Sequence, residues 1–396
     1  MAVRRFALLL LLLLPLALAP AAAQEREPAR AELKLVSLNV WGLPWTPRLE
    51  ARIARLGQEL ARLRPQVVCL QEVWREEDGA ALAAALAAAG LPHSRHWADG
   101  FLGSGLFVAS AFPLRELERR TFALAGKAHK PWHGDWWARK GVVLVSLEGP
   151  LGPLLLATTH LHARYGSDEY LPVQVAQALE VVQAAGDHGV RPPPPGWEPG
   201  RPPLLLAGDL NSPRGALPVR LVLAGAALEA PPGDLGVDWV LARDGGAVEA
   251  RLSSVRPVLD QPLDLGDGQE PVRLSDHPGR LATLVLRRLP RGATVRTADP
   301  RPAWLAVAAE AGALVERERD LALARASSAR KGGFLLLLGS AALYLLARKR
   351  GRKLGCALGL LSLLLLHLAT VQVYLGAVHE RSQAAGLEAA RQGLAR

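Results

Sequence analysis

The sequence predicts a layered α/β domain followed by a helical hairpin able to span a membrane. Two observations predict this organisation. Over residues 33–290, short apolar runs of strand length alternate with segments of helical periodicity, which is typical of sheets covered by helices. Over residues 332–378, two apolar segments flank a short basic one, which favours a membrane hairpin over a buried core hairpin. The 396 residues accommodate one large domain with such extensions.

The chain begins with residues 1–23, which have the layout of a secretory signal peptide. Arg4 and Arg5 supply positive charge, a run of leucines follows, and Ala21–Ala23 offer a small-residue cleavage site. The alternative is an anchor helix that is not cleaved. Residues 24–32 are then expected to link this leader to the domain.

Eight strands, three helices and one long loop are expected within the domain. The strands are Lys34–Val40, Val67–Glu72, Gly105–Ser110, Gly141–Leu147, Leu154–His160, Leu204–Asp209, Val237–Leu241 and Leu281–Leu286. The helices are Pro47–Arg64, Gly79–Ala89 and Pro172–Ala185. The proline-rich stretch Arg191–Pro203 is expected to be a surface loop.

The C-terminal part is expected to comprise a helical linker at 291–331, the hairpin at 332–378 and a tail at 379–396. The second apolar segment, Leu354–Ala377, has 24 residues and is long enough to span a bilayer at about 1.5 Å per residue. The first, Gly332–Ala347, is shorter. Five charges among the six residues 348–353 place the intervening turn in the cytoplasm. Both hairpin ends and the exported domain are then expected on the extracytoplasmic side.

The net charge of +10 lies almost entirely at the ends of the chain. Residues 1–23 and 331–396 together hold 11 Lys and Arg but two acidic residues, so residues 24–330 carry only +1. Because proteins that bind long nucleic acid usually carry a basic excess on the working domain, nucleic acid is not expected as a partner. Cys69 and Cys356 are not expected to pair or to form a thiolate metal site.

Polar residues cluster at the ends of the expected strands, where functional sites of α/β domains gather. They are Asn39, Glu72, His160, Asp209, Asn211, Asp238, Asp276 and His277. Each alone has a structural explanation, such as a cap or an Asx-turn. The occurrence of all of them at strand ends is harder to explain by turn chemistry, and it favours a shared site.

The residue types suit metal-assisted hydrolysis of a phosphate ester. Hard cations prefer oxygen ligands, which Glu72, Asn39 and Asp276 offer, so Mg²⁺ is the expected cofactor and Mn²⁺ an alternative. A histidine can act as general base near neutral pH, and a carboxylate such as Asp238 can hold its tautomer. The sequence contains no competing Ser or Cys nucleophile motif, P-loop or dinucleotide fingerprint.

The ordered set of strand-end residues, with GDLN at 208–211 and SDH at 275–277, resembles the endonuclease/exonuclease/phosphatase superfamily. Within it, LNVWGLPW, QEVW, GSGL, HGDWWARKG, THLHARY and LSDH resemble the neutral sphingomyelinases, and the hairpin is similar in layout to the mammalian type. The resemblance covers residues 33–288. It implies a four-layered α/β/β/α sandwich and hydrolysis of a membrane sphingolipid, sphingomyelin, to ceramide and phosphocholine.

The resemblance also implies roles for the site residues. Glu72 resembles the principal Mg²⁺ ligand, with Asn39 beside it and Asp276 near the metal. Asp209 and Asn211 resemble the pair that orients the nucleophile and the phosphate.

The remaining roles fall to histidines and to one charged pair. His160 resembles the phosphate-stabilising histidine, and His277 resembles the general base with Asp238 as its partner. Asp135 and Lys140 resemble an Asp/Lys pair near the site, for which a loop salt bridge is the alternative.

Other features leave more than one interpretation open. His162 is expected to be structural rather than a second site histidine. Five tryptophans flank the site motifs and suit either core packing or contact with lipid and choline; they are Trp41, Trp45, Trp132, Trp136 and Trp137. The mammalian-type relatives lack a cleaved secretory signal, so the resemblance implies no cellular location for this chain.

Three functions compete at this stage. The first is a membrane-tethered sphingomyelin phosphodiesterase. The second is a nuclease or a phosphoinositide-type phosphatase on the same scaffold, and the near-neutral charge of residues 24–330 counts against the nuclease. The third is a non-catalytic lipid-binding relative, and the complete polar set counts against that.

Overall fold

The computed structural model describes most of the chain outside its first 28 residues. The described residues are 29–98, 103–128, 130, 132–166, 170–187, 201–290, 293 and 300–395. The expected signal peptide lies outside them, as do residues 191–200 of the expected proline-rich loop.

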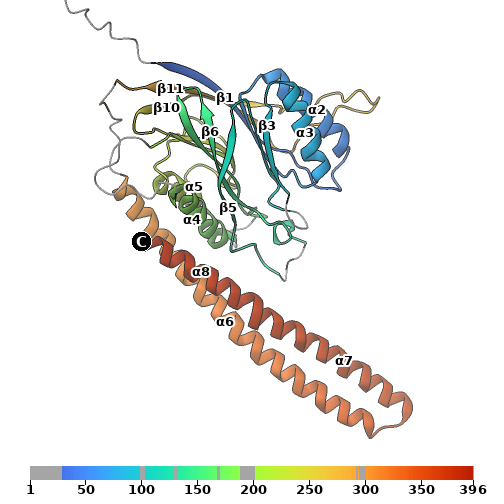
Figure 1. The fold of residues 1–396 in the computed structure, drawn as a ribbon. Helices are drawn as coiled ribbons and strands as arrows, with labels where there is room; N and C mark the ends of the chain where they lie inside the picture. The colour runs from blue at the N-terminus through green and yellow to red at the C-terminus, as the bar shows by residue number, and fades with distance from the viewer. Residues whose placement is uncertain are drawn as a thin grey trace, which may run out of the picture.

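Two sheets form the centre of the domain (Figure 1). The first has the strand order β10-β11-β1-β2-β4-β3. Its strands are β1 (Arg30–Asn39), β2 (Val67–Gln71), β3 (His93–Trp97), β4 (Leu106–Ser110), β10 (Val248–Val258) and β11 (Gly279–Arg288). The second has the order β5-β6-β7-β8-β9. Its strands are β5 (Leu114–Thr121), β6 (Gly141–Gly149), β7 (Gly152–His160), β8 (Leu204–Asp209) and β9 (Asp238–Arg243).

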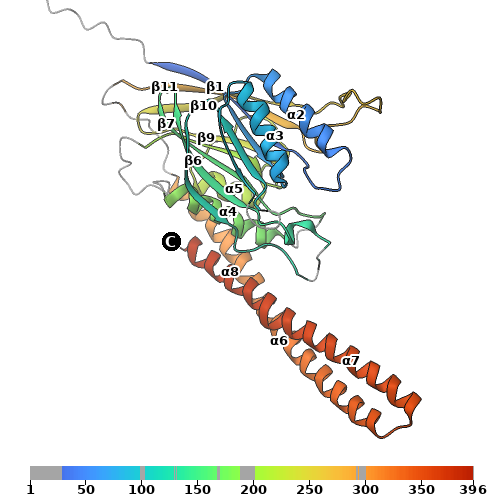
Figure 2. The ribbon, with the colours of Figure 1, turned by 45° about the vertical axis from the view of Figure 1, so that its right-hand side comes forward.

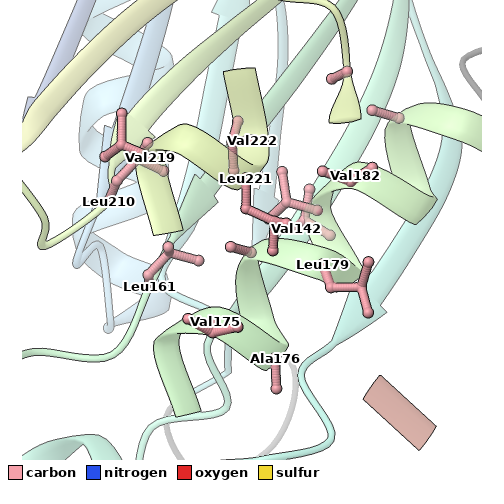
Figure 3. Packing of buried hydrophobic residues seen from close by; sticks show 14 of the residues in the cluster. Val142, Leu161, Val175, Ala176, Leu179, Val182, Leu210, Val219, Leu221 and Val222 are labelled. Carbon is pink, nitrogen blue, oxygen red and sulfur yellow. The ribbon is translucent and has the colours of Figure 1, made fainter. Parts of the chain in front are cut away.

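Helices cover the outer face of each sheet and complete four layers. The helices are α2 (Leu49–Leu63), α3 (Glu76–Ala88), α4 (Leu171–Asp187) and α5 (Leu217–Gly225). One buried cluster draws only on strands of both sheets, so it is the core between them. A second joins the first sheet to α2 and α3. The third joins the second sheet to α4 and α5 (Figure 3). The expected α/β/β/α sandwich is confirmed.

The expected strands and helices are all present, with ends that shift by a few residues, but the described part of the domain has five further elements. They are the strands β3, β5 and β10, the helix α5 and the short 3₁₀ helix η2 (Gly134–Trp136). All three added strands lie at sheet edges. An edge strand buries fewer side chains, so β5, with the sequence LRELERRT, lacks the apolar run on which a strand is recognised.

The C-terminal region is more continuous than the sequence predicts. Helix α6 (Arg301–Arg348) contains residues 301–331 of the expected linker and the first apolar segment, and it continues through Gly332 and Gly333 between them. Its first turns are part of the domain, since Trp304, Val307 and Ala311 lie in the same core as α4 and α5. The part of the 291–331 linker that belongs to α6 is therefore packed against the domain.

After α6 the chain turns at residues 349–351 and returns through α7 (Arg352–Tyr374). A π-helical segment, η4 (Leu375–Glu380), leads into α8 (Arg381–Leu394), which packs back on α4 and α6. Both views show the α6–α7 hairpin projecting away from the domain (Figures 1 and 2). Ser340 and Ser362 join its arms, each hydroxyl donating to the other's carbonyl oxygen at 2.9 and 2.8 Å.

The hairpin exposes many large apolar side chains, among them Phe334, Leu338, Leu360 and Leu363. Both helices are long and apolar enough to cross a membrane. A contiguous apolar surface of this kind is rare on a soluble protein. Cys69 is buried in the domain and Cys356 is exposed on α7, and the two are unpaired as expected.

Candidate active site

Strand register brings the predicted site residues to one end of both sheets. Strands β1 and β2 are parallel, and so are β7 and β8, so their carboxyl ends point the same way. Asn39 is the register partner of Gln71, which precedes Glu72. Asp209 is the register partner of both His160 and Asp238. The register therefore brings these side chains close together, and their sharing one functional site stays a prediction.

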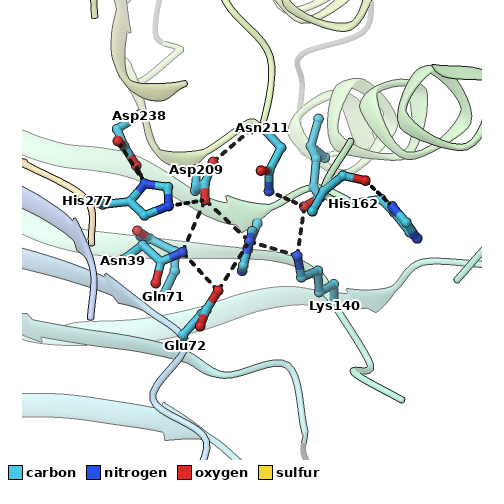
Figure 4. A network of polar contacts seen from close by, with 12 residues as sticks. Asn39, Gln71, Glu72, Lys140, His162, Asp209, Asn211, Asp238 and His277 are labelled. Atoms are coloured by element: carbon cyan, nitrogen blue, oxygen red, sulfur yellow. Dashed lines mark hydrogen bonds and ion pairs between the residues drawn. The ribbon is translucent and has the colours of Figure 1, made fainter. Parts of the chain in front are cut away.

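A network of polar contacts joins the two sheets at this end (Figure 4). The side-chain amide of Asn39 donates to Glu72 Oε1 at 3.0 Å and to Asp209 Oδ2 at 3.1 Å. His160 Nε2 lies 3.4 Å from that same oxygen of Asp209 and 4.0 Å from Glu72 Oε1. Carboxylates from the two sheets are thus bridged by the Asn39 amide, with His160 Nε2 beside them.

The backbone at this end holds three residues other than glycine in a strained conformation. Trp41, Glu72 and Asn211 all have positive φ, at 52°, 61° and 47°, which side chains other than glycine adopt only at a cost. Gly42 permits the close approach of the two connections after β1 and β2, because a Cβ there would lie 2.1 Å from Glu72 O. Strain of this kind is commonly found where function fixes the geometry.

His277 and Asp238 form one side of the site. His277 Nδ1 lies 3.1 Å from each carboxylate oxygen of Asp238, and His277 Nε2 lies 3.9 Å from Asp209 Oδ2. Burial acts to lower the pKa of His277, but the bond to Asp238 and the charges of Asp238 and Asp209 outweigh it and raise this pKa to about 9. The Ser275 hydroxyl holds the segment by donating to Asn39 O at 2.5 Å.

Lys140, Asp135 and His160 form the opposite side. Lys140 Nζ lies 2.8 Å from Asp135 Oδ1, 2.8 Å from His160 Nε2 and 3.1 Å from Leu161 O. Burial and the Lys140 ammonium hold the pKa of His160 well below its usual range. Burial acts to raise the pKa of Asp135, but Lys140 and the neighbouring histidines lower it to about 2. The pair is therefore buried beside His160 and is not an exposed loop salt bridge.

Asp209 and Asn211 lie between these two sides. The backbone N–H of Asn211 donates to Asp209 Oδ1 at 2.8 Å, and the Asn211 amide donates to Leu161 O at 2.9 Å. Burial and the charge of Asp238 raise the pKa of Asp209 to about 7. Because desolvation disfavours the ionised form of Asp209, a positively charged partner would stabilise its carboxylate.

His162 lies behind the site, as expected for a structural residue. Its ring stacks on Tyr170 with centroids 4.2 Å apart, and its Nδ1 is 2.6 Å from Ala163 O and 3.4 Å from Asp135 Oδ2. Burial lowers its pKa to about 4. His162 therefore supports Asp135.

The donor set fits a hard divalent cation at Glu72. The Glu72 Oε2 atom is buried and has no hydrogen-bond partner among the described residues. Burial raises the pKa of Glu72, although Lys140 and Asn39 act in the opposite direction. An orphaned carboxylate oxygen of this kind is suited to a cation ligand. Asp276 is exposed, but its charge is near enough to raise the pKa of Glu72.

A second arrangement of possible ligands is present in Asp209, Asp238 and His277, whose ligand atoms lie within 4.8 Å of one another. The bonds between His277 Nδ1 and Asp238 already use the facing atoms of that pair. His277 and Asp238 are therefore already paired with each other, whereas Asp209 also accepts a bond from Asn39 beside Glu72.

Sequence reasoning missed the residues that hold the site from behind. Arg52 of α2 is fully buried and donates to Val40 O at 3.2 Å and Leu274 O at 2.7 Å, which joins the connection after β1 to the segment carrying His277. Gln174 and Gln177 of α4 bind the His162 backbone from the other side. The sequence does place Arg52, Gln174 and Gln177 among apolar residues on their helices. A polar side chain buried at such a position needs a hydrogen-bond partner, and this could have marked the three residues as supports of the site.

The tryptophans near the site divide into two groups. Trp45 and Trp132 are 74% and 73% exposed, and Trp137 is 49% exposed, so core packing does not explain these three. Trp41 and Trp136 are partly buried, and the Arg52 guanidinium lies 4.9 Å from the Trp41 ring centroid. Three large aromatic surfaces therefore face solvent close to the site motifs.

Parts of the chain are similar in sequence to known proteins. The chain is 34% identical to the Schizosaccharomyces pombe protein named "Inositol phosphosphingolipids phospholipase C" over 178 residues, which are 41% of this chain and 42% of that protein. It is 35% identical to human "Sphingomyelin phosphodiesterase 2" over 182 residues, which are 45% of this chain and 41% of that protein. The matches thus span less than half the length of each relative.

Among solved structures, sphingomyelinase C from Streptomyces griseocarneus is similar at 19% identity with a TM-score of 0.46, covering 65% of this chain and 99% of that one. Residues 36–277 match the Endonuclease/Exonuclease/phosphatase family, and this range contains every predicted site residue. The chain therefore belongs to the Endonuclease/Exonuclease/phosphatase family.

Proposed function

We propose that the protein is a metal-dependent phosphodiesterase that hydrolyses sphingomyelin, or a related choline phospholipid, to ceramide and phosphocholine. The observation that carries this proposal is the contact network that unites Asn39, Glu72, Asp209 and His160 beside the His277–Asp238 pair. Support for the lipid substrate comes from the names of the two relatives and from the apolar hairpin.

His277 is the proposed general base. Because Nδ1 is held by Asp238, Nε2 is the nitrogen that faces the site and takes the proton of the attacking water. The bond that forms joins the water oxygen to phosphorus, and the bond that breaks joins phosphorus to the ceramide oxygen. The proton on His277 can then return to that ceramide oxygen, which balances the reaction.

The opposite side of the site is proposed to stabilise the negative charge on the phosphoryl oxygens. Lys140 is buried against Asp135 and His160, so its charge acts at short range in a region of low polarity. Asn39 and Asn211 place amide donors between the two sides.

Glu72 is proposed to hold Mg²⁺, with Asn39 and Asp276 beside it, and Mn²⁺ is an alternative. When bound, the cation would supply positive charge that stabilises the phosphoryl oxygens and offsets the carboxylate field on His277. The orphaned oxygen of Glu72 supports this assignment.

The hairpin is proposed to anchor the domain in a membrane, with residues 24–330 and 379–396 outside and the turn at 348–353 inside. The return of α8 to the domain supports placing both hairpin ends on one side. The five charges of the turn support placing it in the cytoplasm. Protease added to intact cells should digest the domain and spare an epitope in the turn. Digestion of the turn together with a protected domain would contradict this topology.

Release of water-soluble phosphate esters from vesicles tests the proposed activity. The full chain should release phosphocholine from labelled sphingomyelin in Mg²⁺, and a chelator should abolish release. A panel with inositol phosphosphingolipid, phosphatidylcholine, lyso-phospholipid and DNA tests the head group, and the inositol lipid is included because of the first relative's name. Release that is unaffected by chelator, or cleavage of DNA alone, would contradict the proposal.

A further inference from the structure

Helix α8 follows the second apolar helix yet belongs structurally to the catalytic domain. Leu387, Ala390 and Leu394 of α8 lie in the same buried core as α4, α5 and the second sheet. A Cβ at Gly393 would lie 2.5 Å from Gln183 Nε2, so the backbone of α8 packs closely against side chains of α4. The tail expected at 379–396 is thus a packed helix.

The same helix contacts the chain segment 122–128, which leads from β5 towards Asp135 and Lys140. Gln383 Nε2 donates to Gly126 O at 3.1 Å, and the Ala128 N–H donates to His379 Nε2 at 3.2 Å. A Cβ at Gly386 would lie 2.4 Å from Leu124 Cδ2. Three separate contacts therefore hold this segment against α8 and η4.

The held segment lies directly behind the Asp135 side of the site. Gly126 has a φ of +96°, and a Cβ there would lie 2.5 Å from His162 Nε2. Leu124 O accepts a bond from Gln177 Nε2 at 2.7 Å, and Gln177 Oε1 accepts from the His162 N–H at 2.8 Å. His162 in turn lies 3.4 Å from Asp135, which pairs with Lys140.

The N-terminal end of α8 and the preceding η4 are tied to α6 close to the hairpin. Glu380 pairs with Arg325 of α6 at 2.9 Å. A Cβ at Gly376 would lie 2.9 Å from Ala326 O, so η4 packs tightly on α6 just before the apolar segment begins. The contacts that hold segment 122–128 therefore begin where the proposed membrane anchor ends.

We propose that α8 is a positioning element of the active site, and that Gln383, through Gly126 and His162, holds the Asp135–Lys140 pair in place. The site would then be complete only when the chain has crossed the bilayer twice and returned. This inference rests on the proposed phosphodiesterase function for its catalytic consequence, but its structural part can be measured without activity.

Two variants of Gln383 and a matched control test the inference in the full chain. Gln383→Ala removes the donor to Gly126, and Gln383→Glu keeps the size of the side chain but cannot donate. Gln392→Ala is the control, because Gln392 is an exposed glutamine on the same helix whose amide bonds only to Glu388 within α8 among the contacts described for it. Hydrogen–deuterium exchange of peptides covering 122–140 is measured in all three and in the wild type.

Both Gln383 variants should raise exchange in 122–128 by about three- to tenfold, the effect of one lost hydrogen bond, while the control matches the wild type. On sphingomyelin vesicles, kcat should fall by about three- to tenfold with KM within about twofold, because positioning and not lipid binding is lost. Unchanged exchange overturns the inference whatever the activity, and raised exchange with an unchanged kcat overturns the positioning role. A wild type without hydrolase activity contradicts the proposed function, and the exchange data then still decide whether α8 holds the segment.

Discussion

Two histidines on opposite sides of one site have opposite electrostatic surroundings. His277 is partly exposed and faces Asp238 and Asp209, which raise its pKa to about 9. His160 is fully buried beside the Lys140 ammonium, and its pKa is held well below the usual range. The imidazole of His277 therefore favours the protonated form, whereas the imidazole of His160 favours the neutral form. The difference teaches that neighbouring charges, and not residue type, assign the acid–base role.

The largest expected effect comes from removing the charge of the carboxylate that is proposed to hold the cation. Glu72 contacts Asn39 and lies near His160, so loss of its charge should abolish cation binding. Glu72→Gln should lower kcat/KM by on the order of 10⁴-fold in Mg²⁺ while the fold is retained, measured by vesicle hydrolysis and circular dichroism. Near wild-type turnover would show that the cation is held elsewhere, with the Asp209–Asp238–His277 group as the next candidate.

The next effect tests the His277 side. His277→Ala should lower kcat by about 10³-fold, because the general base is lost, while His93→Ala on edge strand β3 should have no effect. Asp238→Asn should also slow the reaction and shift the pH–rate profile to lower pH, because the raised pKa of His277 depends on Asp238. The double variant should be within about threefold of the worse single one, since the two act as a unit. Fully additive losses would show that they act separately.

A smaller effect is expected on the His160 side. His160→Gln should lower kcat by about 10²-fold, as for the loss of one donor near the phosphoryl oxygens. The shape of the pH–rate profile should stay that of the wild type, because the ring is already neutral across the working range. A shift of the pH–rate profile to lower pH, as expected for Asp238→Asn, would contradict the neutral state assigned to His160.

The smallest effect concerns stability and pH. In chelated protein, His277 has a folded pKa above its unfolded value of about 6.5, so its contribution to stability is present below that pH and is lost as pH rises through about 9. Between these limits the wild type should lose on the order of 1–2 kcal/mol more stability than His277→Gln. Thermal melts at pH 6 and 9 measure this, and parallel curves for the two proteins would contradict the raised pKa.

Much of the site could be predicted because strand ends are easy to recognise. Buried strands such as LLLAGD are continuous apolar runs, and a polar residue at their carboxyl end is brought to the sheet edge by geometry alone. Asn39, Glu72, Asp209 and His160 were predicted on this basis and lie together. Their chemical roles stay predictions, since geometry shows proximity and not function.

The supporting parts could not be predicted because they depend on contacts between distant segments. Gln383 contacts a residue 257 positions away, and Arg52 contacts one 222 positions away. Nothing in the local sequence around Gln383 distinguishes it from the exposed Gln392. The edge strands were missed for a related reason, because their identity depends on the neighbour with which they pair and not on an apolar pattern of their own.

Helix α6 runs without a break from the domain core at Val315 into the apolar segment that begins after Lys331. Arg325, which ties it to η4, lies only about 9 Å of helix rise from that boundary. With the hairpin in a bilayer, a helix that continues unbroken through Gly332 and Gly333 would restrict both the height and the tilt of the domain. The active site would then reach only lipids close to its own anchor. Its turnover would depend on how fast substrate lipid diffuses to it within the leaflet.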